Sequence, residues 1–164
     1  MIFDRQNKPS NEQEIQRFEE KKGVRLPADY RKFLLEFNGG RPAADNATWK
    51  TTGSNFLDVD EFYGLTDSSL NSIETERFNN FSDFMHSRLL QIGHSYGSGL
   101  YVDLREGQTH GRIYILARPA NETLQVDDTG FQDEDDYEEA LFLHPVANTF
   151  SEFVKILGPY PDEA

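Results

Sequence analysis

The stretch IQRFEEKKGVRLPADYRKFLLEFNGGRP, from Ile15 to Pro42, decides the fold of this chain. Its second half carries four large apolar residues at the spacing i, i+3, i+4 and i+7, which puts them on one face of a helix. These residues are Tyr30, Phe33, Leu34 and Phe37. Pro27 suits the first turn of that helix, and Asn38-Gly39-Gly40 suits its end, because Asn and Gly accept left-handed backbone. We expect the apolar face to lie in the core.

A second helix is predicted just before this one. Ser10 and Gln13 have the S-x-x-Q spacing of a capping box, in which two side chains satisfy free N–H groups at a helix start. Ile15 and Phe18 then share one face, and Gly23 suits the end. The chain therefore begins its core with two consecutive helices.

Beyond Pro42 the pattern changes from helix to strand. Residues 41–54 are expected to form a loop that contains Trp49, followed by a strand at 56–59 and a helix that starts at Asp67 or Ser68. The apolar positions of that helix are Leu70, Ile73, Phe78 and Phe81. Glycine-rich turns separate three further strand candidates, as in an antiparallel meander. These candidates are Leu89–Ile92, Leu100–Leu104 and Arg112–Ala117, and residues 123–126 are a possible edge strand.

The end of the chain predicts a closing helix. Thr149 and Glu152 again match a capping box, and Gly158-Pro159 stops the helix. Phe150 and Phe153 fall on its inner face. With no internal repeat and no linker, we expect one α+β domain over residues 1–164, with its core at about 10–158.

Composition excludes several classes of function. The chain of 164 residues has a net charge of −13, which repels phosphate backbones and argues against direct binding of DNA or RNA. The same charge favours a basic protein partner. Cysteine is absent, so disulfides, thiol nucleophiles and Cys-ligated metals are excluded. No apolar run suits a signal peptide or a membrane span, and a soluble, cytoplasmic protein is expected.

The opening stretch resembles the N-terminal signature of the SUKH superfamily, the Smi/Knr-like proteins. The resemblance rests on Ile15, Glu19, Gly23, Leu26-Pro27, Asp29-Tyr30, Phe33-Leu34 and Asn38-Gly39-Gly40. The segments FLDVDEFYGL, LLQIGHSYGSGLYVDLREGQTHGRIYIL and VANTFSEFVKIL look like later parts of the same domain.

This resemblance implies helices packed on a curved, mainly antiparallel sheet, and no catalytic residues. Bacterial members are mostly immunity proteins that bind and neutralise toxins, many of which are nucleases. Fungal relatives regulate cell-wall synthesis through protein contacts. The resemblance thus implies a non-enzymatic protein-binding domain, with a basic toxin domain or an endogenous protein as its partner.

Gly93-His94-Ser95-Tyr96-Gly97 spells G-x-S-x-G, the pattern around the nucleophilic serine of many esterases. A nucleophile elbow needs a helix after the serine, whereas Ser95 is followed by glycines and then by a predicted strand. We therefore interpret the glycines as a turn between strands. A small serine hydrolase remains the weakest of the hypotheses.

No cofactor or metal site is predicted. Asp58 and Asp60 hint at a calcium loop, but Phe62 stands where an oxygen ligand belongs. The histidines have no spacing typical of metal ligands. They are His86, His94, His110 and His144.

The candidate partner-binding site is an acidic patch between residues 127 and 139. It consists of Asp127, Asp128, Asp133, Glu134, Asp135, Asp136, Glu138 and Glu139. Its carboxylates could take the place of phosphates in the substrate groove of a basic toxin, or could simply be a solvated loop. Phe131 and Tyr137 are possible aromatic anchors, as is Trp49, for which burial in the domain is the favoured alternative. The sequence leaves these alternatives, and the oligomeric state, open.

Overall fold

A computed structural model of the chain describes residues 1, 3–44, 47–50, 56–67, 72–74, 89–95, 98–116 and 143–159. The side chains of residues 49–50 and 56–57 are not among the described parts. The helices are α1 (Glu12–Lys22), α2 (Ala28–Glu36) and α5 (Phe150–Ile156). The strands are β1 (Phe3–Gln6), β2 (Gly40–Pro42), β3 (Thr48–Lys50), β4 (Phe56–Asp58), β5 (Glu61–Phe62), β6 (Leu89–Ser95), β7 (Ser98–Asp103), β8 (Ile113–Leu116) and β9 (Leu143–Ala147).

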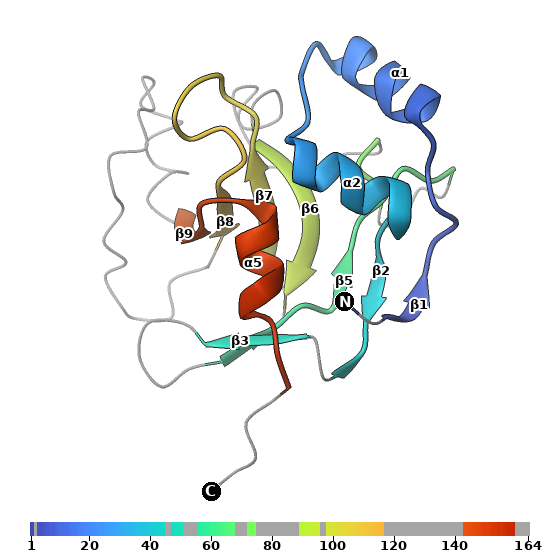
Figure 1. Cartoon of the computed structure of the whole chain (residues 1–164). Coiled ribbons are helices and arrows are strands. Elements are labelled where there is room, and N and C mark those ends of the chain that lie inside the picture. The colour runs from blue at the N-terminus through green and yellow to red at the C-terminus, as the bar shows by residue number, and fades with distance from the viewer. Residues whose placement is uncertain are drawn as a thin grey trace, which may run out of the picture.

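The main sheet has seven strands in the order β1-β2-β5-β6-β7-β8-β9, and each neighbouring pair is antiparallel. Helices α2 and α5 lie across one face of this sheet, and α1 lies at one end (Figure 1). Strands β3 and β4 form a separate two-stranded sheet, to which Gly158 is joined by two backbone hydrogen bonds with Thr48. This arrangement confirms the α+β class.

The start of α1 differs from the prediction by one residue. Asn11, not Ser10, is the N-cap: its Oδ1 accepts a hydrogen bond from the Glu14 amide at 3.0 Å, and the Glu14 carboxylate accepts one from the Asn11 amide at 3.0 Å. The capping box is therefore N-x-x-E, because the Glu14 carboxylate is a stronger acceptor than the Gln13 amide. Ser10 donates its hydroxyl hydrogen bond to Glu14. Gly23 ends the helix at φ 65°, as predicted.

The apolar face of α2 is buried as predicted. Tyr30, Phe33 and Leu34 lie in the core, and Phe37 is half-buried against it. Pro27 is the N-cap and so lies just outside the first turn. The side chain of Asp29 accepts a hydrogen bond from the Ser151 amide at 2.8 Å, which links the start of α2 to α5.

The Asn38-Gly39-Gly40 turn joins α2 to the sheet. All three residues have positive φ, at 55°, 82° and 120°. A Cβ at Gly39 would lie 2.6 Å from the Phe62 carbonyl oxygen, so a side chain has no room there. The turn needs glycine both for its backbone conformation and for its close approach to β5.

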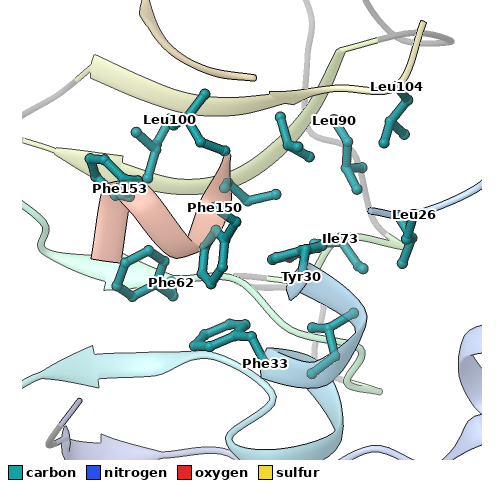
Figure 2. Packing of buried hydrophobic residues seen from close by; sticks show 14 of the residues in the cluster. Leu26, Tyr30, Phe33, Phe62, Ile73, Leu90, Leu100, Leu104, Phe150 and Phe153 are labelled. Carbon is teal, nitrogen blue, oxygen red and sulfur yellow. The ribbon is translucent and has the colours of Figure 1, made fainter. Parts of the chain in front are cut away.

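The main core lies between the helices and the sheet (Figure 2). Phe62 of β5 contacts the rings of Phe33 and Phe150 at centroid distances of 5.5 and 5.9 Å, and Phe33 and Phe150 are 4.8 Å apart. Residues from α2, from β5 and from the closing helix therefore meet at one aromatic cluster. This packing fixes α2 and α5 on the sheet.

The predicted meander is confirmed by β6, β7 and β8, and β4 confirms the strand at 56–59. The loop predicted at 41–54 is wrong in part, because residues 41–42 belong to β2 and residues 48–50 form β3. Strands β1 and β9 were not predicted, since neither has a clear alternation of apolar and polar residues. The edge strand predicted at 123–126 lies outside the described residues. Of the helix predicted to start at Asp67 or Ser68, residues 72–74 are described, and there the prediction is wrong: Ser72 forms a bridge with Gly64, and residues 73–74 form a turn in which Ile73 is buried.

The closing helix begins where the sequence predicts. Thr149 is the N-cap, and its hydroxyl accepts a hydrogen bond from the Glu152 amide at 3.1 Å. The Glu152 carboxylate accepts its bond from the Asn148 amide, one residue before the expected donor. Phe150 and Phe153 are buried, as expected for the inner face.

Candidate functional site

The acidic patch at 127–139, with Phe131 and Tyr137, lies outside the described residues. Trp49 has its backbone in β3, paired with Leu57 of β4, while its side chain lies outside the description. The partner-binding site predicted from the sequence therefore stays a prediction. The elements on both sides of the patch do show where it joins the fold.

The patch belongs to the connection between β8 and β9, which are neighbours in the sheet. Leu116 ends β8, Leu143 begins β9, and these two residues are partners in the strand register. The connection thus leaves and re-enters the sheet at the same point, beside its last strand. A partner bound by residues 127–139 would be attached to this edge of the sheet through both ends of the connection, at Leu116 and Leu143.

The face of the sheet opposite the main core carries a second, smaller cluster beside that edge. Its members come from β6, β7, β8 and β9 and alternate with residues of the main core along each strand. They are Leu89, Tyr101, Tyr114 and Leu143, with Leu116 packed against them. The start of β9 and the end of β8 are therefore held by apolar contacts on this face.

Polar side chains on the same face form hydrogen bonds with one another. Gln91 donates from Nε2 to the Gly93 carbonyl oxygen at 2.9 Å and to the Tyr63 hydroxyl at 3.3 Å, and the Tyr101 hydroxyl donates to Gln91 Oε1 at 3.4 Å. Burial raises the pKa of Tyr63, and the charge of Glu61 raises it further. The Tyr63 phenol therefore stays neutral at physiological pH, and both phenols act as structural hydrogen-bonding groups.

A buried ion pair closes one end of this face. The Asp103 carboxylate, which is fully buried, accepts hydrogen bonds from Arg105 Nε at 3.0 Å and from one terminal guanidinium nitrogen at 2.6 Å. It also accepts one from the Arg105 amide at 2.8 Å. Burial by itself lowers the pKa of Arg105, but the bonds to Asp103 and its charge outweigh burial and raise it. The pair fixes the loop between β7 and β8.

Sequence reasoning did not single out Asp103 and Arg105. Their i, i+2 spacing at the end of a strand was the available signal, because residues two apart point to the same face. Burial raises the pKa of the neighbouring Tyr114 as well, while the positive charge of Arg112 opposes this rise. The loop is thus bordered by charged and phenolic groups that belong to the fold.

Ser95 is a structural residue of β6. It is fully buried, and its hydroxyl donates to the Asp58 carbonyl oxygen at 2.5 Å. Ser95 ends β6 and is paired with Ser98, the first residue of β7, so the next described element after the serine is a strand. Gly93 and Gly99 lie within β6 and β7, so the interpretation of these two glycines as a turn is wrong, and Gly97 lies outside the described residues. The strand after Ser95 contradicts a nucleophile elbow, which requires a helix there.

The calcium-loop hint at Asp58 and Asp60 also has a structural explanation. Asp58 accepts a hydrogen bond from the Thr48 hydroxyl at 2.5 Å, which ties β4 to β3, and Phe62 is buried in the core. Within the described ranges, no three His, Asp or Glu side chains form a group that could hold a metal ion. His94, His110 and His144 lie on β6, on the β7–β8 loop and on β9, and His86 is outside the description.

The fold agrees with the family that comparison with known proteins gives. A model of the SMI1/KNR4 family (SUKH-1) matches residues 9–156, which is nearly the whole domain. The chain belongs to this family. SUKH proteins are known in toxin immunity and in cell-wall regulation, they bind protein partners such as toxins, and they are generally non-catalytic. No curated protein matches the chain.

Membership also fits the boundaries of the core. The matched range begins at Pro9, just before α1, and ends at Ile156, the last residue of α5. It therefore includes both helical blocks and the whole meander of this SUKH domain. None of the helices in the described part of the chain combines the length and apolar character needed to cross a bilayer.

Proposed function

We propose that this SUKH protein is a bacterial immunity protein that neutralises a cognate toxin by direct, stoichiometric binding, without catalysis, in the cytoplasm where the toxin acts. The observation that carries the proposal is the family match over residues 9–156, combined with a net charge of −13. Many toxins opposed by such proteins are nucleases, whose substrate grooves are basic because they bind phosphates. An acidic protein is complementary to such a groove.

Within this proposal, the acidic patch of residues 127–139 is the contact surface. Its carboxylates would pair with Lys and Arg of the toxin and occupy the place of the nucleic-acid backbone. Phe131, Tyr137 and Trp49 would supply apolar anchors, since interface energy concentrates in a few aromatic residues. The position of the connection beside the last strand of the sheet supports this role, because the pairing of Leu116 with Leu143 fixes both ends of the β8–β9 connection.

The test is to look for a toxin-bearing protein encoded next to this one, and to measure its capture and inhibition by this protein. Wild type is compared with a variant in which Asp133, Glu134, Asp135 and Asp136 become Asn or Gln. A matched control neutralises four exposed acids elsewhere, namely Asp4, Glu20, Glu36 and Asp67. Both variants change the net charge from −13 to −9, by removing four negative charges.

We expect the wild type and the control to abolish toxin activity at a one-to-one ratio, and the patch variant to need at least about tenfold more protein, with binding weakened by salt. Equal inhibition by all three proteins would refute the acidic patch but leave immunity standing. Failure of the wild type to bind or inhibit the neighbouring toxin would refute immunity.

The alternative is a regulatory or scaffold module that binds an endogenous protein, for example in the control of cell-wall synthesis. The family match favours it as well, because SUKH proteins are known in both roles. Capture of cell-wall enzymes in place of a toxin, with growth defects in a deletion strain, would favour this alternative.

A further inference from the structure

A groove of about 820 Å³ lies between the turn from α1 to α2 and the loop from β7 to β8. These two segments are far apart in sequence but lie at the same end of the domain (Figure 1). The described residues that line the groove are Lys22, Gly23, Val24 and Arg25 on one wall and Leu104, Arg105, Glu106, Gly107 and His110 on the other. Neither the comparisons nor the proposed function assigns this groove a role.

The groove is positively charged in a strongly acidic protein. Lys22, Arg25 and Arg105 line it, and Glu106 is the one acid among the described lining residues. The charge of Arg105 is balanced by its buried partner Asp103, so the excess of positive charge comes from Lys22 and Arg25. Arg25 is exposed and has no ion-pair partner in the described part of the chain. The chain as a whole carries 29 acidic and 16 basic residues, so this is a local inversion of charge. A surface of this kind attracts anionic groups that the rest of the protein repels.

Both walls of the groove are held by hydrogen bonds before any ligand binds. In the first wall, Glu19 accepts from the Val24 amide with its backbone carbonyl at 3.1 Å and from the Leu26 amide with its carboxylate at 2.8 Å. In the second wall, Asp103 fixes the Arg105 guanidinium and accepts from the Gly111 amide at 2.8 Å. Fixed walls reduce the entropy lost on binding.

The charges around the groove favour carboxylates over phosphates as its ligands. The last turn of α1 forms part of the wall, and the negative end of a helix dipole disfavours a concentrated dianion. Glu106 at the same place adds to that repulsion. Apart from His110, the described lining residues offer no aromatic ring on which a nucleobase could stack. Single carboxylates spaced along a chain fit the separated cations better than a phosphate does.

We propose that this groove binds an acidic peptide segment of a protein partner, with carboxylates of the segment paired to Lys22 and Arg25, while Arg105, held by Asp103, forms part of the wall. The residues that line the groove are different from residues 127–139, so the proposal does not depend on the identity of the partner as a toxin. A basic groove on an acidic protein sets the orientation of a partner. In any other orientation, the acidic segment of the partner would face the acidic surface of this protein and be repelled.

The test uses the full ¹⁵N-labelled chain, with hexaglutamate peptide as the probe, followed by amide chemical shifts. About 0.1 M NaCl is present, which shortens the Debye length to about 10 Å and screens the repulsion from distant acids. We expect the largest shift changes at Gly23, Val24 and Gly107 in the groove. Lys22→Glu with Arg25→Glu should weaken binding at least about tenfold, because two attractions become repulsions.

The matched control is Lys32→Glu with Arg41→Glu, which reverses two exposed cations away from the groove and makes the same change in net charge. The control should bind the peptide within about twofold of wild type. Shift changes outside the groove, or equal weakening by both double variants, would overturn the proposal. Inorganic phosphate at matched anion concentration is the second probe, and equal or larger shifts with phosphate would overturn the choice of an acidic peptide.

Discussion

The two faces of the main sheet are built in different ways. The face under α2 and α5 is packed with apolar side chains, including the ring cluster of Phe33, Phe62 and Phe150 (Figure 2). The opposite face mixes a small apolar cluster with the hydrogen bonds of Gln91 and the buried pair of Asp103 and Arg105. One face is held by burial of apolar area and the other depends largely on paired polar groups.

This difference separates the part of the domain that gives stability from the part that shapes its binding surfaces. Apolar packing has no directional requirement, and it stabilises the fold in proportion to the apolar area buried. Paired polar groups add less net stability, but they fix the orientation of their side chains. A buried polar group without its hydrogen-bond partner costs free energy, so the paired arrangement is strongly preferred. The Asp103–Arg105 pair positions the β7–β8 loop that forms one wall of the basic groove.

The largest effect is expected on the apolar face. Phe62→Ala removes a fully buried ring that contacts Phe3, Phe33, Phe150 and Phe153. We expect the free energy of unfolding to fall by about 3–5 kcal/mol, because the lost transfer energy is accompanied by a cavity. Urea denaturation followed by circular dichroism measures this. Ile156→Ala is the control, since this side chain is 49% exposed and should cost less than about 1 kcal/mol.

On the opposite face, Asp103→Leu should destabilise by about 3 kcal/mol. The Arg105 side chain is 14% exposed, so removing the carboxylate leaves a mostly buried cation without its partner. Asp103→Leu combined with Arg105→Met should recover most of the loss, because replacing a whole buried pair by apolar groups is close to neutral.

The same two variants connect stability with the groove. The double variant should bind hexaglutamate more weakly than wild type although its stability is recovered, since the Asp103–Arg105 pair no longer fixes the wall of the groove. If the double variant is as unstable as Asp103→Leu, the pair is not what holds this face, and the contrast between the two faces is wrong.

The parts of the fold that could be predicted from the sequence are those held by apolar packing. The apolar residues from Tyr30 to Phe37 predict a buried helix face, and so do Phe150 and Phe153. Apolar residues repeated every 3.6 positions are a strong signal of a helix with one buried face. The meander was visible from apolar runs between glycines. Strand β9 was missed because its sequence, LHPVA, contains a proline that is tolerated in an edge strand.

Paired polar contacts were much harder to predict. Asn38 was recognised as the end of α2, but its side chain also donates to the carbonyl oxygens of Lys8 and Leu65 and accepts from the Leu65 amide. These partners lie about 30 residues away on either side, so no local pattern indicates them. The cations of the basic groove come from two distant turns for the same reason. The acidic patch, which is continuous in sequence, could be proposed from sequence alone.

A smaller effect is expected at Ser95, where one hydrogen bond crosses from β6 to the Asp58 carbonyl oxygen. Ser95→Ala should lower the free energy of unfolding by about 1 kcal/mol, the usual net value of one such bond. Any ester hydrolysis found in a preparation should be unchanged in this variant. Loss of such activity with unchanged stability would return Ser95 to the candidates for a nucleophile.

The smallest expected effect is the pH dependence of the α1 cap. The hydrogen bond from the Ser10 hydroxyl, followed by that from the Asn11 amide, lowers the pKa of Glu14 below its ordinary value of 4.5. Since the pKa is depressed in the folded state, its stabilisation is fully present above pH 4.5 and is lost as the pH falls through the lower folded value. Glu14 is exposed, so solvent screening limits the effect to about 0.5 kcal/mol or less.

Glu14→Gln removes this titration while retaining an oxygen acceptor at the cap. Between pH 6 and pH 3, the wild type should therefore lose slightly more stability than the variant, as measured by urea denaturation at each pH. Glu20→Gln makes the same charge change on the same helix and serves as the control for the charge of α1. If Glu14→Gln and Glu20→Gln show identical pH profiles, the capping carboxylate contributes no more than any other acid on the helix surface.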